Sequence, residues 1–372
     1  MTNPLLFRTY REGDFEKISE LLSGRANAEW DWEYQKNRLG NFIGIAEIDG
    51  RIVGHMALVP VQLKIADKTV IGCQAVDLVV HKDFRRQGIF LSLGEFLVQE
   101  TTKRGFHFWY GFPNKLAHSG HLKYGWFNVC NVPHLVKPIN SRKVARALLE
   151  AIIQNRKKAK FLINNRIARS AILALFRIGL RISAFLRTFT QTRRECQEQT
   201  VEISPLEFFE SSFDDFWKTV SRNYPISIVR DSRYLNWRYF EKPSADYKVL
   251  AARRGNEIAG YIVLGSKEEG GLKTGYIVDI LSSPNDVLAI TDLISTAVEH
   301  FQREKYDLVN CWIMKESESS RLYYRILRDF GFFQFSSRSH PLIARVNSPQ
   351  LVPDLVYDAS NWFVTAGDSD NI

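Results

Sequence analysis

The chain has 372 residues, with 50 Lys and Arg against 41 Asp and Glu and a formal charge of +9. Hydrophobic residues make up 45% and charged residues 24%, a composition that is typical of a globular protein and excludes a disordered one. The length predicts about two or three domains at roughly 100–200 residues each. No uncharged apolar run approaches the roughly 18–20 residues that cross a bilayer, and the first residues lack the order of a signal peptide, so we expect a cytoplasmic protein.

In chain order, the first 135 residues alternate strand-like and helix-like segments. Apolar periodicity and turn residues predict strands over 5–9, 42–48, 52–61, 63–71, 75–80 and 106–112, and helices over 14–22 and 88–104. We expect Asp14 to cap the first helix and Asp49-Gly50 to turn a hairpin. The alternation predicts an α/β fold with a mixed sheet and helices on its faces.

Residues 200–345 repeat this plan weakly. Trp32-Glu33-Tyr34 precedes the first hairpin turn, and Trp237-Arg238-Tyr239 precedes a second one at Arg254-Gly255. Repetition in a consistent order predicts a tandem duplication. We expect domains over 1–138 and 200–346, joined by an insert over 139–199 and followed by a tail over 347–372.

The segment after the strand at 75–80 carries the clearest functional signal. A short polar turn containing Arg85 and Arg86 follows the strand, and Gly88 then opens a helix. The first N–H groups of a helix have no partner within it and its dipole is positive there, so this turn could bind a phosphate. An ordinary strand-to-helix connection with a solvated basic turn is the alternative.

The run resembles motif A of the GCN5-related N-acetyltransferase (GNAT) superfamily, Arg/Gln-x-x-Gly-x-Gly/Ala, which holds the pyrophosphate of acetyl-CoA. Arg85 and Gly88 match, whereas Phe90 stands in place of the usual Gly or Ala and Lys82 in place of a frequent Pro. A second pattern of the superfamily, Asn-x-x-Ala-x-x-x-Tyr-x-Lys-x-Gly-Phe, follows in register. It is met by Asn114, Ala117, His121, Lys123, Gly125 and Trp126, with His121 at the Tyr position.

The resemblance covers about residues 5–135 and implies that acetyl-CoA is a co-substrate and that no metal is needed. Acetyl-CoA would lie between the strands at 75–80 and 108–112. The implied cofactor-binding residues are Leu78, Val79, Val80, Arg85, Arg86, Gln87, Gly88, Ile89, Phe90 and Asn114.

The transfer of an acetyl group to an amine needs a base for the amine and an acid for the departing thiolate. In the family a Tyr often serves as the acid, and His121 stands in its place, although a histidine there could instead pack or cap. Asp77, Glu47 and His55 are the candidate bases. Asp77 is the odd polar residue of an apolar strand, and a structural hydrogen bond would explain it equally well.

The second half lacks the phosphate signature, since Ser282-Ser283-Pro284-Asn285-Asp286 follows its corresponding strand. We expect this half to bind no acetyl-CoA and to act as scaffold or substrate wall, with Asp286 capping a helix that runs to about His300. The chain's last residues resemble C-terminal segments of GNAT-like proteins encoded with bacterial surface-polysaccharide genes. Either Asp368 and Asp370 attract a cationic amine beside Trp362, or the end of the chain is frayed and solvated.

The positive charge lies in the insert. Residues 142–194 hold 14 basic residues and one acidic residue, giving +13, so the other 319 residues carry −4. An amphipathic helix with Arg166, Arg169 and Arg177 on one face suits an anionic membrane surface; docking of its apolar face on the two halves is the alternative. We do not expect nucleic-acid binding, because no aromatic stacking pattern accompanies the charge.

The four cysteines have no metal-like spacing and predict reduced thiols: Cys73, Cys130, Cys196 and Cys311. Together these features predict an N-acetyltransferase that moves an acetyl group from acetyl-CoA to a primary amine of a small molecule, such as an amino sugar or a glycan precursor. The alternative is a catalytically degenerate GNAT-like binding or assembly module at a membrane surface.

Overall fold

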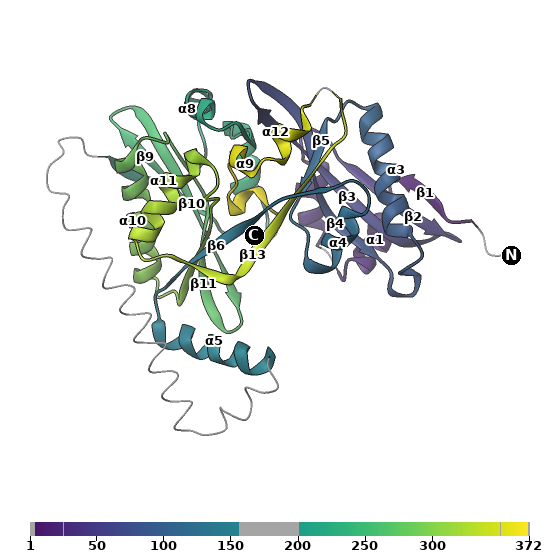
Figure 1. Ribbon diagram of the computed structural model, residues 1–372, viewed down its shortest axis with the longest axis horizontal. Helices are drawn as coiled ribbons and strands as arrows, with labels where there is room; N and C mark the ends of the chain where they lie inside the picture. The colour runs from purple at the N-terminus through teal and green to yellow at the C-terminus, as the bar shows by residue number, and fades with distance from the viewer. Residues whose placement is uncertain (1–3, 25, 156–200, 350, 371–372) are drawn as a thin grey trace.

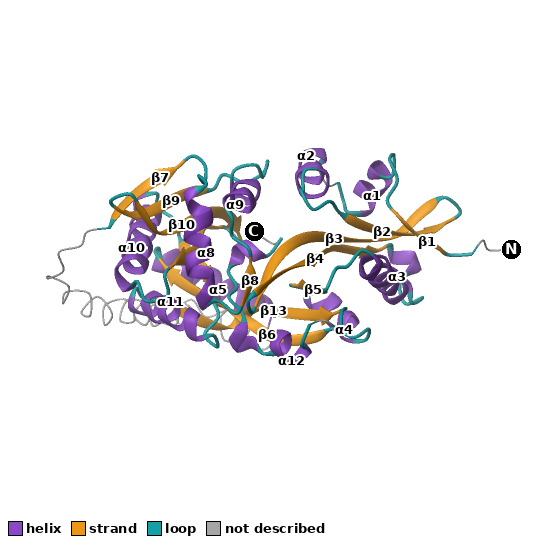
Figure 2. Cartoon of the chain, turned by 90° about the horizontal axis from the view of Figure 1, so that it is seen from above, coloured by secondary structure: helices purple, strands orange, loops and turns teal. Residues whose placement is uncertain are grey.

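The computed structural model describes residues 4–24, 26–155, 201–349 and 351–370. Its two halves lie side by side with the C-terminus between them (Figures 1 and 2). Most of the predicted basic helix, and Cys196, fall outside the described residues. The first 14 residues of the 142–194 segment lie in α5 (Ser141–Asn155), which packs beside the second half.

A single 13-stranded sheet runs through both halves in the order β1-β2-β3-β4-β5-β13-β6-β12-β11-β10-β9-β7, with β8 paired to β3. The strands are β1 (Leu6–Thr9), β2 (Phe42–Ile48), β3 (Arg51–Ile65), β4 (Lys68–Val80), β5 (Phe108–Gly111), β6 (Phe127–Pro138), β7 (Glu202–Leu206), β8 (Ile226–Ile228), β9 (Lys248–Arg254), β10 (Glu257–Glu269), β11 (Leu272–Ser282), β12 (Leu308–Trp312) and β13 (Phe333–Val346). The β4–β5 and β11–β12 pairs are parallel, and the other strand pairs are antiparallel.

The two halves exchange their last strands. β6 of the first half pairs with β12 of the second, and β13 of the second pairs with β5 of the first. β6 and β13 also pair with each other at the centre of the sheet, where Figure 1 shows them crossing between the halves. The exchange makes the apolar core continuous: Phe108 and Tyr110 of β5 belong to the same buried cluster as Ile262 and Val278. The mixed α/β fold is therefore confirmed.

Helices cover both faces of each half-sheet. In the first half, α1 (Phe15–Leu21), α2 (Asn27–Trp30) and the π-helical turn η1 (Asp31–Gln35) lie on one face, and α3 (Ile89–Lys103) and α4 (Lys115–Leu122) lie on the other (Figure 2). The second half carries α8 (Ser212–Val220), α9 (Ser232–Tyr239), α10 (Val287–Arg303) and α11 (Glu318–Asp329), and α12 (Pro353–Tyr357) follows β13. The helices α3 and α10 make the crossovers that the two parallel strand pairs require.

Two details of the first half differ from the prediction. The strands expected at 63–71 and 75–80 are parts of one long hairpin, in which β3 runs to Ile65 and β4 begins at Lys68. Asp14 precedes α1, but its carboxylate does not cap the helix. It accepts hydrogen bonds from the Arg8 guanidinium (2.6 and 2.9 Å) and from the Arg11 N–H (2.7 Å) instead, because the half-buried guanidinium of Arg8 needs a charged partner.

The sequence repeat at Trp32 and Trp237 becomes a contact between the halves. The two indoles stack with centroids 4.9 Å apart and an interplanar angle of 16°. Each indole N–H donates to the other residue's carbonyl oxygen, at 2.7 and 3.1 Å. This reciprocal pairing places the repeated segments about a local two-fold axis.

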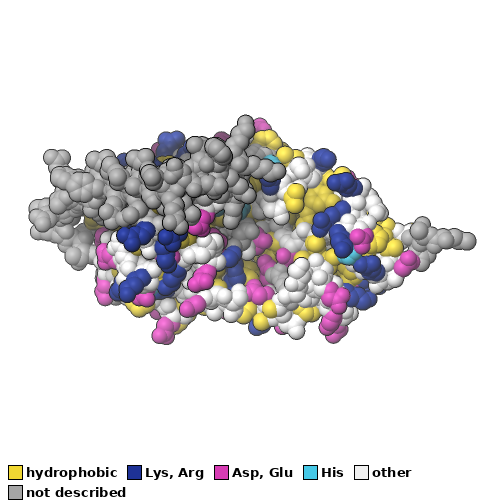
Figure 3. Space-filling view, turned by 90° about the horizontal axis from the view of Figure 1, so that it is seen from below, with side chains coloured by type: hydrophobic (Ala, Val, Ile, Leu, Met, Phe, Trp, Pro, Cys, Tyr) yellow, Lys and Arg dark blue, Asp and Glu magenta, His cyan; other side chains and the backbone are white. Residues whose placement is uncertain are grey.

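Charges of both signs cover the described surface on the face in Figure 3. Lys and Arg side chains gather in clusters on both halves, with Asp and Glu side chains between them. Among the described helices, none is long and apolar enough to cross a membrane.

Candidate functional site

The turn between β4 and α3 has the backbone of an open anion cradle. Arg86 and Gly88 lie in the left-handed region, with φ of 66° and 81°. A Cβ built on Gly88 would meet no atom within 4 Å, so the backbone there is open to close approach. The first N–H groups of α3 have no acceptor within the helix. Main-chain donors and open space therefore coincide at Gly88, as binding of a phosphate requires.

Basic and polar side chains surround this turn. Arg85, Arg86, Gln87 and Gly88 are all exposed. The Arg85 Nε donates to the carbonyl oxygen of Val80 at 3.0 Å, which holds the guanidinium beside the end of β4. The structure thus brings the predicted phosphate residues to one surface.

Phe90 stands where the GNAT pattern has Gly or Ala, and its ring is accommodated by α4. A Cβ on Gly120 would come within 2.8 Å of this ring, so only a glycine leaves room for it. The ring also makes edge contacts with His121 and Tyr124, at centroid distances of 5.2 and 5.6 Å. Because the ring packs against α4, Phe90 can take the place of a Gly or Ala while α3 still begins at Ile89.

β4 loses its parallel partner before it reaches the turn. Its pairing with β5 covers Gly72 to Gln74 alone, and β5 ends at Gly111. Beyond Gln74, β4 kinks at Asp77, whose φ is 49°, where its register with β3 also shifts. The following residues, Leu78 to Val80, are half-buried. An extended ligand arm could pair with this strand edge, as peptides do in strand addition.

An open pocket of about 360 Å³ lies beside Asp77, between the two halves. It is lined by Leu22, Gly24, Glu29, Trp32, Glu33, Asp77, Arg238, Lys242 and Asp370. The Tyr34 hydroxyl donates to the Asp77 carboxylate at 2.6 Å, and the Gln74 amide donates to Asp370 at 3.1 Å. Four carboxylates face two cations here, so the pocket favours a positively charged guest.

The first of the two cations, Arg238, is held by hydrogen bonds within the protein. Arg238 is 5% exposed and donates to the carbonyl oxygens of Gly367 and Ser369. Lys242 lies near the Trp32 and Tyr247 rings. Burial, followed by repulsion from Arg238, lowers the pKa of Lys242 to about 8. The pocket therefore loses one positive charge as the pH rises through about 8.

His121 and Asp77 do not lie in one pocket. His121 is 4% exposed, is packed against Phe90 and Trp126, and bonds the Tyr124 hydroxyl at 2.9 Å through Nδ1. Burial and the neighbouring His118 lower its pKa to about 4, so the ring is neutral at pH 7. The assignment of His121 as the acid stays a prediction.

The other predicted residues serve visible local contacts. Glu47 is ion-paired with Arg8 and does not line the pocket. His55 is buried and its Nδ1 bonds the Asp77 carbonyl oxygen at 2.8 Å. The Asn114 side-chain oxygen caps α4 by accepting from the N–H groups of Leu116 and Ala117. The roles of these residues in binding or catalysis also stay predictions.

Sequence reasoning did not single out the pocket walls Glu29, Glu33 and Lys242. The repeat of Trp32-Glu33-Tyr34 in Trp237-Arg238-Tyr239 could have indicated this pocket, because the two segments face each other across the local two-fold axis and both contribute to its walls. The last predicted detail of the second half is confirmed: the Asp286 carboxylate caps α10 by accepting from the Ala289 N–H. It also pairs with Arg254 at 2.5 Å, so an acidic side chain stands at this helix start.

Known proteins resemble this chain in one sequence domain and in overall fold. A family model described as an acetyltransferase (GNAT) domain matches residues 7–127, whereas no curated protein matches the chain. The chain is similar in structure to a GCN5-related N-acetyltransferase from Anabaena variabilis ATCC 29413, with a TM-score of 0.61, 10% identity, and coverage of 93% of this chain and 73% of that one. It is also similar to one from Kribbella flavida, with a TM-score of 0.55, 10% identity, and coverage of 92% and 71%.

A third similar structure is Saccharomyces cerevisiae N-myristoyltransferase with bound myristoyl-CoA. The TM-score is 0.55 at 12% identity, and the match covers 98% of this chain and 90% of that one. Identities this low show the fold alone, so the match to residues 7–127 is what identifies a domain. Residues 7–127 thus match a GNAT acetyltransferase domain, and the chain as a whole has a GNAT-like acyltransferase fold.

Proposed function

We propose that the protein is an N-acetyltransferase that moves the acetyl group of acetyl-CoA to a primary amine of a small molecule. One observation carries the proposal: an acidic pocket at Asp77, the edge of β4 that β5 leaves beyond Gln74, and an open left-handed turn at the start of α3 follow one another along the chain. The turn suits a pyrophosphate, the strand edge suits the pantetheine amides, and the pocket suits an ammonium group.

The proposed reaction starts with a charged amine in the pocket. The amine binds near Asp77 and loses a proton, directly to a carboxylate or through water, because only the neutral nitrogen attacks the thioester carbon. The new C–N bond replaces the C–S bond, and the CoA thiolate leaves and takes up a proton. Tyr34, through its hydrogen bond, holds the Asp77 carboxylate in one orientation.

An assay of thiol release tests this proposal. The full chain is mixed with acetyl-CoA and a panel of primary amines that includes amino sugars and glycan precursors, the class we propose first for this polar pocket. We expect CoA release with a subset of the amines, and an acetylated amine by mass spectrometry. If none of the amines supports CoA release and the chain does not bind acetyl-CoA, a binding or assembly module would remain as the function.

The Asp77→Asn variant localises the chemistry. It keeps the side chain's size and a hydrogen-bonding oxygen but removes the charge, and loss of a proton acceptor costs about a hundredfold or more in kcat/KM. Asp215→Asn is the matched control, because that carboxyl lies on α8 and its side chain is 82% exposed. Equal rates for wild type and Asp77→Asn would remove Asp77 from the mechanism.

His121 is tested separately as the proposed acid. Comparison of kcat/KM against pH for wild type and His121→Phe measures its contribution, and an unchanged profile would exclude the role.

Contact of residues 142–194 with an anionic membrane stays a proposal that rests on the +13 charge of this segment. Co-sedimentation of the full chain with vesicles, with and without anionic lipid, tests it. Binding that is indifferent to lipid charge would favour docking on the protein.

A further inference from the structure

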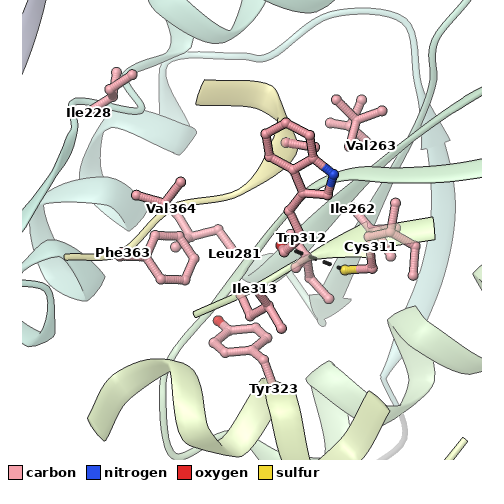
Figure 4. Close-up of a cluster of buried hydrophobic side chains, with 14 of the residues drawn as sticks. Ile228, Ile262, Val263, Leu281, Cys311, Trp312, Ile313, Tyr323, Phe363 and Val364 are labelled. Carbon is pink, nitrogen blue, oxygen red and sulfur yellow. Dashed lines mark hydrogen bonds between the residues drawn. The ribbon is translucent and has the colours of Figure 1, made fainter. Parts of the chain in front are cut away.

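Residues 362–369, near the end of the chain, are buried and not frayed or solvated. Trp362, Phe363 and Val364 are each 2% exposed or less, and Asp368 and Ser369 are 4% and 0% exposed. Figure 4 shows Phe363 and Val364 among side chains of the second-half core such as Leu281, Ile313 and Tyr323. The segment 362–369 is therefore part of the folded body.

The second half repeats the geometry around Asp77. There the Tyr239 hydroxyl donates to the Asp279 carboxylate at 3.0 Å, as Tyr34 does to Asp77 in the first half. Tyr34 and Tyr239 each lie two residues after the stacked tryptophans. Asp279 is on β11, next to a register shift that leaves Val278 as the extra residue. The two aspartates thus occupy corresponding places at the irregularities of β4 and β11.

The space facing the two aspartates is used differently. Asp77 faces the open pocket, whereas Asp279 is 1% exposed and faces the C-terminal segment. The Thr365 hydroxyl donates to Asp279 at 2.9 Å. A Cβ on Gly367 would lie 2.1 Å from the Tyr239 hydroxyl and 3.3 Å from the Val278 carbonyl oxygen. Only a glycine fits between the segment and this strand irregularity.

Two buried arginines hold the segment. Arg230, which is 1% exposed, donates to both oxygens of Asp368 at 2.9 Å and to Asp279 at 3.2 Å. Arg238 donates to the carbonyl oxygens of Gly367 and Ser369. Buried charge pairs of this kind fix geometry, because removal of one partner leaves the other without compensation.

The held segment ends in the first half's pocket. Past Ser369 the chain reaches Asp370, which accepts from the Gln74 amide on β4 and lines the pocket with Asp77. A residue that enters one half is thus anchored by side chains of the other.

We propose that the second half binds residues 365–369 of its own chain at the place that corresponds to the first half's site, and that this grip sets the position of Asp370 for the substrate amine. This inference rests on the proposed function. Arg230, Arg238 and Tyr239 are positioning residues, and Asp370 binds the ammonium group.

Gly367→Ala tests the grip without touching the first half. Its Cβ collides with the Tyr239 hydroxyl, so the segment must shift, and removal of that hydroxyl in Gly367→Ala/Tyr239→Phe makes room again. With an amine found active in the thiol-release assay, we expect Gly367→Ala and Asp370→Asn each to raise the amine KM about tenfold, the loss expected for one charge-assisted contact. The Kd for acetyl-CoA stays within about twofold, and the double variant returns toward the KM of Tyr239→Phe alone.

Gly275→Ala is the control for general damage to the second half. Its Cβ would lie 2.4 Å from Phe301, away from the C-terminal segment, so it costs stability but leaves the amine KM unchanged. If Gly367→Ala alone does not fold, the amine KM of the double variant and of Tyr239→Phe is compared directly with that of Asp370→Asn.

Three results would overturn the inference: an unchanged amine KM in Gly367→Ala, an equal rise in Gly275→Ala, or no recovery in the double variant. Failure of the proposed function is distinguishable, because wild type would then acetylate no amine at all.

Discussion

The left-handed glycine at the start of α3 allows a sharp test of acetyl-CoA binding. Gly88 and Gly105 flank the same helix with φ of 81° and 78°, and a Cβ on either would meet no atom within 4 Å. A non-glycine residue in this region costs roughly 1–2 kcal/mol. Gly88→Ala and Gly105→Ala should therefore destabilise the protein by similar amounts, measured as the free energy of unfolding in denaturant.

Ligand binding should separate the two variants. Only the methyl group added by Gly88→Ala enters the space proposed for the pyrophosphate. Loss of one close main-chain contact to a phosphate weakens binding by about tenfold, which corresponds to about 1.4 kcal/mol. Calorimetric titration with CoA measures the Kd of each. Equal affinities for the two variants would refute the assignment of the phosphate to this turn, because both variants carry the same backbone strain and differ only in where the methyl group lies.

The remaining predictions use other contacts of the first half. Gly120→Ala should lower the free energy of unfolding in urea, because its Cβ would lie 2.8 Å from the Phe90 ring. Adding Phe90→Leu to this variant should recover part of the lost stability. No recovery would mean that another contact is responsible. The pKa of His121 is about 4 in the folded chain and about 6.5 unfolded, so the unfolded state binds more protons between these values and stability falls as pH drops from 6.5 to 4; this component should vanish in His121→Phe. Lys242, with a pKa of about 8, loses its charge as pH rises from 7 to 9, so the KM of a cationic amine should fall over that range, and Lys242→Met should show no such fall.

The sequence by itself determined the elements that local residues specify. The hairpin at Asp49-Gly50, the helix that opens at Gly88 and the cap at Asp286 all rest on neighbours a few residues away, and the structure has each of them. The repeat of Trp32 in Trp237 predicts a tandem duplication, and the structure stacks the two indoles against each other. Asp14 is the local signal that misled, because Arg8 offers its carboxylate a stronger, charged partner than the helix N–H groups do.

Only the tertiary structure decided how the halves combine. The exchange of β6 and β13 has no local signature, since either strand could complete either half and the choice depends on which pairing buries the central sheet. The pocket draws Glu29, Asp77, Lys242 and Asp370 from four separate parts of the chain. The C-terminal segment is ordered by Arg230, whose buried charge requires a carboxylate that lies 138 residues away in the chain. Long-range burial and charge compensation, which no short stretch of sequence encodes, therefore built the site.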